Sequence, residues 1–145
     1  MTKKVFIVED EPDLRDTLQY NFENEGFKVK SFPNGESFLE TIKNDKPNLV
    51  ILDLMLPGIS GLDVCRDLRM KKVNENVAVV MLTAKSEEID RIVGFELGAD
   101  DYVTKPFSVR ELILRVKVLL KKRSDDIDQN VLEFGPIAMN LDAHD

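Results

Sequence analysis

The stretch "VILDLMLPGISGLDV" (50–64) joins a continuously apolar run to a single aspartate, Asp53, and then to a loop that contains proline and glycine. An unbroken apolar run of this kind predicts a strand that is covered on both faces. A carboxylate at the end of such a strand is costly to bury unless it is paired or takes part in chemistry. Asp53 is therefore the first candidate for a functional residue.

Strand-like and helix-like segments alternate on both sides of this stretch. Short apolar or alternating runs predict five strands, at 4–8, 27–32, 48–53, 77–82 and 101–104. Apolar residues at helical spacing predict five helices, one between Pro12 and Gly26, one that opens at Gly61, and three at 35–44, 86–97 and 108–122. Such repeats predict an α/β fold, a parallel sheet with helices on both faces and functional residues at the carboxyl ends of its strands.

Composition narrows the class of protein. The chain has 145 residues and a net charge of −7, and residues 124–145 contain acidic side chains but no lysine or arginine. We find no basic stripe typical of nucleic-acid binding and no apolar run long enough to cross a membrane. The N-terminus has no signal-peptide pattern, and the single cysteine, Cys65, suits an apolar position in a reducing compartment. We therefore expect a cytoplasmic protein, in which the only histidine, His144, is exposed and has no role.

Polar side chains with related chemistry follow four of the predicted strands. Residues 9–11 are all acidic, Asp53 ends the third strand, Thr83 follows the fourth, and Lys105 follows the fifth. Carboxylates packed together repel one another unless a cation lies among them. An all-oxygen ligand set without cysteine or histidine suits Mg²⁺. With a hydroxyl and an amine nearby, these residues predict a site that accepts a phosphoryl group on an aspartate.

Each of these residues also has a purely structural explanation. Asp10 could cap the following helix, Thr83 could be an ordinary strand residue, and Lys105 could be a solvated lysine. The matching chemistry at four strand ends favours the functional interpretation. The turn "EDEPDL" (9–14) lacks the glycines of a nucleotide or flavin site. Met55 stands where dehalogenase-type phosphohydrolases carry a second aspartate, so we expect a long-lived phosphoryl group and not an enzyme with rapid turnover.

The same motifs resemble the receiver domain of two-component response regulators. They are "EDE" (9–11), "DLMLPGISG" (53–61), "LTA" (82–84) and "GADDYVTKPF" (98–107), and the resemblance extends over 3–122. The second and fourth motifs are especially similar to the OmpR/PhoB subfamily of transcription factors. The resemblance implies a flavodoxin-like, doubly wound five-stranded parallel sheet of order 2-1-3-4-5 with five helices.

The resemblance also implies a role for each site residue. Asp53 would accept the phosphoryl group from a sensor histidine kinase or a small phosphodonor. Mg²⁺ would be held by Asp10, by Asp53 and by the backbone carbonyl of Met55, with Glu9 acting through water.

Three further residues would respond to the phosphoryl group. Thr83 and Lys105 would bind its oxygens, and the small side chain of Ala84 would leave room for it. Tyr102 would be the switch aromatic, which moves inward once Thr83 has moved. The resemblance further implies that the peptide bond between Lys105 and Pro106 is cis.

A dimer face is expected on the helix 86–97, the strand 101–104 and the helix 108–122. Some apolar residues of these helices point away from the sheet and are flanked by charges of both signs, which is typical of a protein contact. The alternative is an ordinary mixed surface. The expected face comprises Arg91, Ile92, Phe95, Glu96, Asp101, Glu111, Leu114, Arg115 and Lys117.

The last part of the chain predicts a second function. We interpret residues 1–122 as the receiver domain, 123–130 as a linker and 131–145 as the start of a winged-helix effector domain that is incomplete here. The whole protein would bind DNA only through that domain and would control transcription as a homodimer. Two alternatives stay open, a stand-alone receiver that docks on a protein target and a Mg²⁺-dependent phosphohydrolase.

Overall fold

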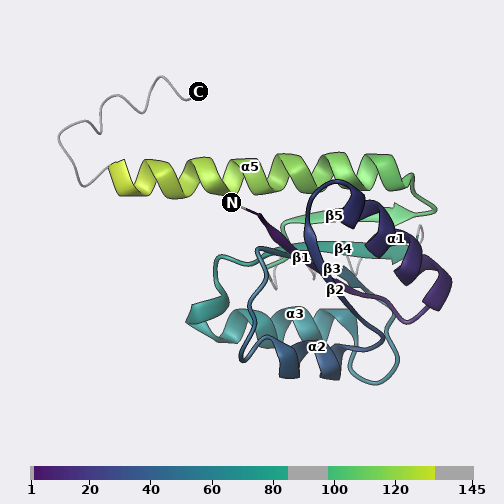
Figure 1. Ribbon diagram of the computed structural model, residues 1–145. Helices are drawn as coiled ribbons and strands as arrows, with labels where there is room; N and C mark the ends of the chain where they lie inside the picture. The colour runs from purple at the N-terminus through teal and green to yellow at the C-terminus, as the bar shows by residue number, and fades with distance from the viewer. Residues whose placement is uncertain (1, 85–97, 133–145) are drawn as a thin grey trace.

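Five parallel strands form the centre of the protein, whose computed structural model describes residues 2–84 and 98–132, with side chains through residue 123 (Figure 1). The strand order is β2-β1-β3-β4-β5, which confirms the predicted flavodoxin-like topology. The strands are β1 (Lys4–Val8), β2 (Lys28–Phe32), β3 (Leu49–Asp53), β4 (Ala78–Ala84) and β5 (Asp101–Lys105).

Helices cover both faces of this sheet (Figure 1). Helices α1 (Pro12–Asn24) and α5 (Val109–Leu132) lie on one face, and α2 (Gly35–Thr41) and α3 (Gly61–Met70) lie on the other. A short 3₁₀ helix, η1 (Lys72–Asn74), joins α3 to β4. Because each crossover between parallel strands is right-handed, the direction in which the chain moves along the sheet decides which face the helix covers. α1 leads from β1 outward to β2, whereas α2 and α3 lead in the opposite direction, so α1 lies on the other face from α2 and α3. The predicted helix at 86–97 lies outside the described residues.

Each strand of the centre contributes to two separate apolar layers. In β1, Val5 and Ile7 pack towards α1 and α5, whereas Phe6 and Val8 pack towards α2 and α3. Because successive side chains of a strand point to opposite faces, a strand covered on both sides needs apolar residues at every position. All five residues of β3 are buried, which explains why the four residues before Asp53 are all apolar.

Helix α5 differs from its predicted form. The expected end at residue 122 is wrong, because the helix continues to Leu132. Residues 123–130 are polar but contain neither glycine nor proline, so nothing in their sequence stops a helix that α5 has already nucleated. The side chain of Arg123 donates to Asp100 at 2.6 Å and to the carbonyl of Asn76 at 3.2 Å. The role of 123–130 as a linker stays a prediction, and 133–145 lie outside the described residues.

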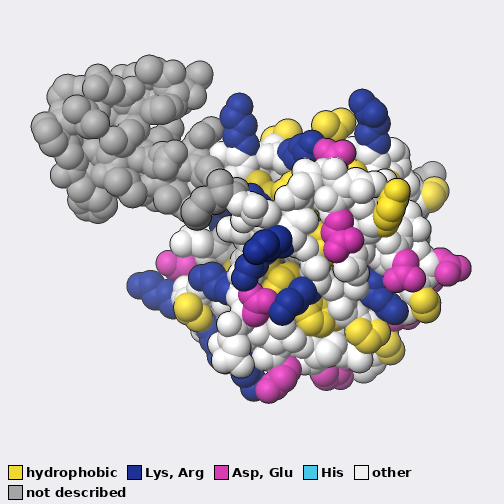
Figure 2. All heavy atoms as spheres, viewed as in Figure 1, with side chains coloured by type: hydrophobic (Ala, Val, Ile, Leu, Met, Phe, Trp, Pro, Cys, Tyr) yellow, Lys and Arg dark blue, Asp and Glu magenta, His cyan; other side chains and the backbone are white. Residues whose placement is uncertain are grey.

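The visible surface is electrostatically mixed. Figure 2 shows lysine and arginine side chains interspersed with acidic ones, together with isolated apolar side chains, on the face seen in Figure 1. No helix within 2–84 and 98–132 combines the length and the apolar character that a bilayer-spanning segment needs.

The packing of α3 against the end of β3 leaves no space for a side chain at Gly61. A Cβ there would overlap the carbonyl oxygen of Asp53 and would lie 2.8 Å from the Cα of Leu54. Ser60 is the N-cap of this helix, and its hydroxyl accepts a hydrogen bond from the amide of Asp63 at 3.2 Å. The start of α3 therefore fixes the backbone of Asp53.

We expect Gly61→Ala to lower the free energy of unfolding by about 1–3 kcal/mol, because the methyl group overpacks a rigid backbone contact. Denaturant titration measures this change. The matched control is Gly26→Ala, where φ is +93° but a Cβ meets nothing within 4 Å. Both variants lose stability, but only Gly61→Ala should shift the amide resonances of 53–55. Unchanged resonances at these residues in Gly61→Ala would contradict the contact.

Candidate functional site

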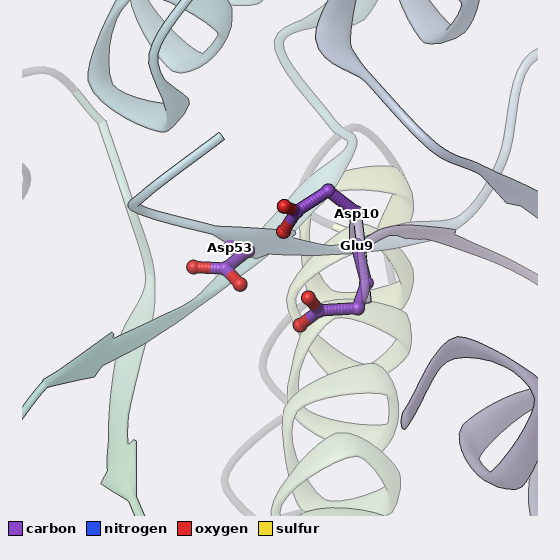
Figure 3. A group of neighbouring side chains, drawn as sticks. All are labelled: Glu9, Asp10 and Asp53. Atoms are coloured by element: carbon purple, nitrogen blue, oxygen red, sulfur yellow. The ribbon is translucent and has the colours of Figure 1, made fainter. Parts of the chain in front are cut away.

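Three carboxylates meet at the carboxyl end of the sheet. Glu9 and Asp10 follow β1, and Asp53 is the last residue of β3. Each of the three offers an oxygen atom, and these atoms all lie within 4.8 Å of one another (Figure 3). Glu9 is only 1% exposed and Asp53 only 3%, whereas Asp10 is exposed. The predicted convergence of these strand ends is confirmed.

Lys105 provides a positive charge at the cluster. Its ammonium lies 2.7 Å from Oδ2 of Asp53 and 3.4 Å from Oε1 of Glu9. The other oxygen of Asp53 accepts from the amide of Met55 at 2.9 Å. Burial by itself would lower the pKa of Lys105, but the hydrogen bond and the charge of Asp53, with help from Glu9, raise it above its usual value. The lysine therefore stays protonated.

Glu9 has a perturbed acidity. Its pKa rises from 4.5 to about 7, chiefly because burial disfavours the charged form, and also because of the hydrogen bond and charge of Asp53. The amide of Glu11, which donates to Glu9 at 3.0 Å, and the charge of Lys105 act in the opposite direction. Once Glu9 has lost its proton, two buried carboxylates near a single ammonium leave an excess of negative charge.

The donor set fits Mg²⁺. It consists of carboxylate oxygens, two of them buried and one exposed, with an excess of negative charge that a divalent cation would offset. When bound, Mg²⁺ would neutralise charge on a phosphoryl group at this position. Glu9, Asp10 and Asp53 are the residues that would hold it.

The other predicted site residues lie at neighbouring strand ends. Thr83 is 1% exposed and its hydroxyl donates to the carbonyl of Ala84 at 3.3 Å. It follows Leu82, which pairs with Asp53 in the sheet, and Ala84 pairs with Lys105. The peptide bond between Lys105 and Pro106 is cis, as the resemblance implied.

Two further expectations concern buried side chains. Tyr102 is 5% exposed and belongs to the core on the side of α2 and α3, so the inward position expected after phosphorylation is already present here. The movement of Tyr102 stays a prediction. Cys65 is buried in the same core, and burial raises the pKa of its thiol to about 11, in agreement with an apolar structural role. The predicted exposure of His144 lies outside the described residues.

The expected dimer face is partly described. Arg115 pairs with Asp101 at 3.1 Å and with Glu111 at 3.2 Å, and Leu114 is 54% exposed. Lys117 pairs with Glu25, the residue that follows α1, and its part in a dimer stays a prediction. The remaining expected members, Arg91, Ile92, Phe95 and Glu96, lie outside the described residues.

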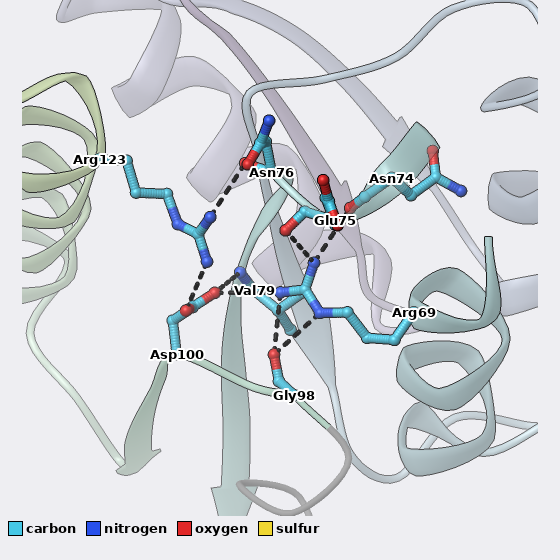
Figure 4. Close-up of polar contacts among 8 residues, drawn as sticks. All are labelled: Arg69, Asn74, Glu75, Asn76, Val79, Gly98, Asp100 and Arg123. Atoms are coloured by element: carbon cyan, nitrogen blue, oxygen red, sulfur yellow. Dashed lines mark hydrogen bonds and ion pairs between the residues drawn. The ribbon is translucent and has the colours of Figure 1, made fainter. Parts of the chain in front are cut away.

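A second polar cluster lies at the opposite end of the sheet (Figure 4). The carboxylate of Asp100 contacts Arg69 at 3.1 Å and Arg123 at 2.6 Å, and it accepts from the amide of Val79 at 2.8 Å. Arg69 also donates to the carbonyl of Gly98 at 2.8 Å. This cluster joins α3, β4 and α5. Sequence analysis missed it, because its members are far apart in the chain.

Arg15 is a second residue that sequence analysis missed. Its guanidinium donates to the carbonyl oxygens of Glu9 at 2.8 Å and of Asp10 at 3.4 Å. The available signal was a basic residue in the first turn of a helix, where positive charge opposes the helix dipole.

Comparisons with known proteins agree with this geometry. Residues 5–117 match the family model of the response regulator receiver domain. The sensory transduction protein RegX3 of Mycolicibacterium smegmatis is 46% identical over 144 residues, which cover 97% of this chain and 62% of that protein. The phosphate regulon transcriptional regulatory protein PhoB of Rhizobium meliloti is 42% identical over 144 residues, covering 99% of this chain and 63% of that protein.

Comparison with solved structures indicates the same family. The receiver domain of the TMAO respiratory system response regulator TorR is 43% identical with a TM-score of 0.77, covering 83% of this chain and 98% of that one. The receiver domain of the Francisella response regulator 1452 is 30% identical with a TM-score of 0.76, again with 83% and 98% covered. The chain belongs to the response regulator receiver domain family. It spans about 62% of the length of the RegX3 proteins that it matches.

The acidity of Glu9 predicts a pH dependence of stability in the metal-free protein. Between pH 4.5 and about 7 the folded state keeps a proton on Glu9 that the unfolded state has lost, so stability falls as the pH rises through this range. Glu9→Gln stays neutral and removes this penalty. In EDTA, its melting temperature relative to the wild type should therefore rise from about pH 5 to about pH 8.

The control is Glu40→Gln. Glu40 is exposed on α2, and its hydrogen bond with Lys43 lowers its pKa, so neither state titrates in this range. Its melting temperature relative to the wild type should stay constant. A constant difference for Glu9→Gln as well would show that Glu9 is not protonated in the folded protein.

Proposed function

We propose that this protein is a two-component response regulator in which Asp53 accepts a phosphoryl group from a phosphohistidine of a sensor histidine kinase. The observation that carries the proposal is the buried Asp53 carboxylate, held 2.7 Å from the ammonium of Lys105 beside Glu9 and Asp10. A buried structural ion pair would not need two further carboxylates beside it. A site that receives a metal and a phosphoryl group does need them.

The transfer step uses groups that this chain supplies. A carboxylate oxygen of Asp53 attacks phosphorus, and the bond between phosphorus and the histidine nitrogen breaks with its electron pair left on the imidazole. The amide of Met55 orients the Asp53 carboxylate through its hydrogen bond of 2.9 Å. Lys105 loses part of its pairing with Asp53 when the acyl phosphate forms, and its ammonium then binds a phosphoryl oxygen. Mg²⁺ held by Asp10 and Asp53, with the carbonyl of Met55 and with Glu9 through water, would balance the added negative charge.

The phosphorylated site then changes the surface of the domain. Thr83 lies at the end of β4 and would turn its hydroxyl from the carbonyl of Ala84, which it contacts at 3.3 Å, to a phosphoryl oxygen. Tyr102 on the neighbouring strand would be held inward by this change. Tyr102 directly follows Asp101, which pairs with Arg115, and Arg115 also pairs with Glu111. A change at Tyr102 would therefore reach these charged residues, which would exchange their pairs within the chain for pairs with a second copy.

The names of the relatives support a proposal for what the whole protein controls. PhoB of Rhizobium meliloti is named a transcriptional regulatory protein, and this chain matches 63% of its length. We therefore infer that the whole protein is a cytoplasmic transcription regulator that binds DNA as a homodimer, through a winged-helix domain beyond the receiver.

Incubation with Mg²⁺ and acetyl phosphate should add one phosphoryl group to the wild type and none to Asp53→Asn, because an amide oxygen does not attack phosphorus. Asp10→Ala should also gain none, because it removes a metal ligand. Intact-mass spectrometry measures the gain. The matched control is Asp63→Asn, an aspartate on α3 whose side chain is 44% exposed, and it should be phosphorylated like the wild type. Phosphorylated Asp53→Asn would end the proposal, and rapid turnover of a phosphate ester would favour a phosphohydrolase.

Beryllofluoride with Mg²⁺, which mimics the phosphoryl group, should raise the mass of the protein in sedimentation towards that of a dimer. Arg115→Glu should prevent this rise, because it removes the partner of Asp101 and Glu111, yet Asp53 should still be phosphorylated. Arg66→Glu on α3 is the control and should dimerise normally. An activated wild type that stays monomeric at tens of micromolar would favour a stand-alone receiver.

A further inference from the structure

Arg15 is the fourth residue of α1, in the first turn of the helix. A positive charge in this position interacts unfavourably with the helix dipole, typically by 0.3–1 kcal/mol. This unfavourable placement makes the contacts of Arg15 informative.

These contacts are all with one short acidic segment. The guanidinium donates through Nη1 to the carbonyl oxygens of Glu9 at 2.8 Å and of Asp10 at 3.4 Å. The backbone amide of Arg15 donates to the carbonyl of Glu11 at 2.9 Å. The backbone bond to Glu11 is the ordinary i→i−4 bond of a helix, so the side chain of Arg15 itself holds the backbone of two consecutive acids, Glu9 and Asp10.

Apart from the amide of Glu9, which donates to the carbonyl of Phe32 at 3.0 Å, the segment has few other restraints on its backbone. Pro12 has no amide hydrogen, and the side chain of Glu11 makes no capping hydrogen bond at the start of α1. The carboxylate of Glu9 is fixed by Lys105 and by the amide of Glu11. The carboxylate of Asp10 is exposed, and the part of the chain that the structure describes gives it no hydrogen-bond donor. The position of Asp10 therefore depends on its backbone.

We propose that Arg15 is a positioning residue for the metal site. Its guanidinium fixes the carbonyl groups of Glu9 and Asp10, and this keeps the Asp10 carboxylate within reach of Asp53 against the repulsion among the acids. The inference rests on the proposed Mg²⁺ site. It extends the site beyond the residues that would touch the metal.

The charge of Arg15 and its positioning role predict opposite effects of its removal. If Arg15 mattered only through its charge, its loss would strengthen Mg²⁺ binding, because a cation near the site repels the metal. If Arg15 positions Asp10, its loss weakens Mg²⁺ binding, since partners that orient metal ligands typically contribute 10–100-fold to affinity. The sign of the change separates the two explanations.

The experiment compares Arg15→Gln, Arg15→Lys and the control Arg66→Gln, which removes a positive charge from an exposed site on α3. The Mg²⁺ dissociation constant follows from the rise of the unfolding midpoint with MgCl₂ at constant ionic strength. We expect binding about tenfold weaker in Arg15→Gln. We expect partial recovery in Arg15→Lys, whose ammonium can reach one carbonyl, and wild-type affinity in Arg66→Gln.

The phosphorylation rate with acetyl phosphate provides a second readout. In Arg15→Gln it should require more Mg²⁺ than in the wild type but approach the wild-type maximum at saturation. Unchanged or stronger Mg²⁺ binding in Arg15→Gln overturns the inference, as does a wild type that does not bind Mg²⁺. If Arg15→Gln does not fold, the Mg²⁺ affinity of Arg15→Lys is compared with that of the wild type, and unchanged or stronger binding again overturns the inference. Weaker Mg²⁺ binding by these variants, in a wild type that acetyl phosphate does not phosphorylate, would support Arg15 while rejecting the proposed function.

Discussion

The burial of two carboxylates beside one ammonium is the constraint on which the rest of the structure depends. Asp53 and Glu9 are 3% and 1% exposed, and each would lose several kcal/mol of hydration if it carried an unpaired charge. Burial, together with the hydrogen bond and charge of Asp53, outweighs the charge of Lys105 and raises the pKa of Glu9 to about 7. The site thus carries an excess of negative charge once Glu9 is ionised, and a divalent cation would offset it.

A rigid backbone is needed to keep carboxylates that repel one another close together. β3 is buried at every residue and is paired on both sides, with β1 and with β4. The start of α3 is packed against the carbonyl of Asp53 so closely that only glycine fits at position 61. Mutual repulsion among the carboxylates therefore cannot relax by movement of the strand, because each displacement would disturb two apolar layers at once.

The polar clusters at the two ends of the sheet differ in charge balance, and this difference distinguishes a structural contact from a reactive site. At the amino end, Asp100 lies between Arg69 and Arg123, and its oxygens also accept from the amide of Val79. That cluster has more cations than anions and well-placed donors, so it stabilises the junction of α3, β4 and α5. At the carboxyl end three carboxylates lie together, and Lys105 is paired with two of them, Glu9 and Asp53. Carboxylates that outnumber the cations around them at a strand end indicate a ligand site, whereas a carboxylate that is fully paired with cations and amide donors indicates a structural contact.

The sequence by itself predicted the five strands of a parallel sheet and the residues that gather at its carboxyl end, whereas the strand order came from the resemblance to receiver domains. Apolar periodicity and turn residues are local signals, and parallel strands bring their carboxyl ends to one edge whatever their distance in the chain. Tertiary structure alone decided the Asp100 cluster, the pairing of Lys117 with Glu25 and the contacts of Arg15. The continuation of α5 to Leu132 has a local cause that the polar composition of 123–130 obscured, because that segment contains neither glycine nor proline. The side-chain contacts, in contrast, depend on which residues meet across elements, and a linear pattern contains no information about such distances.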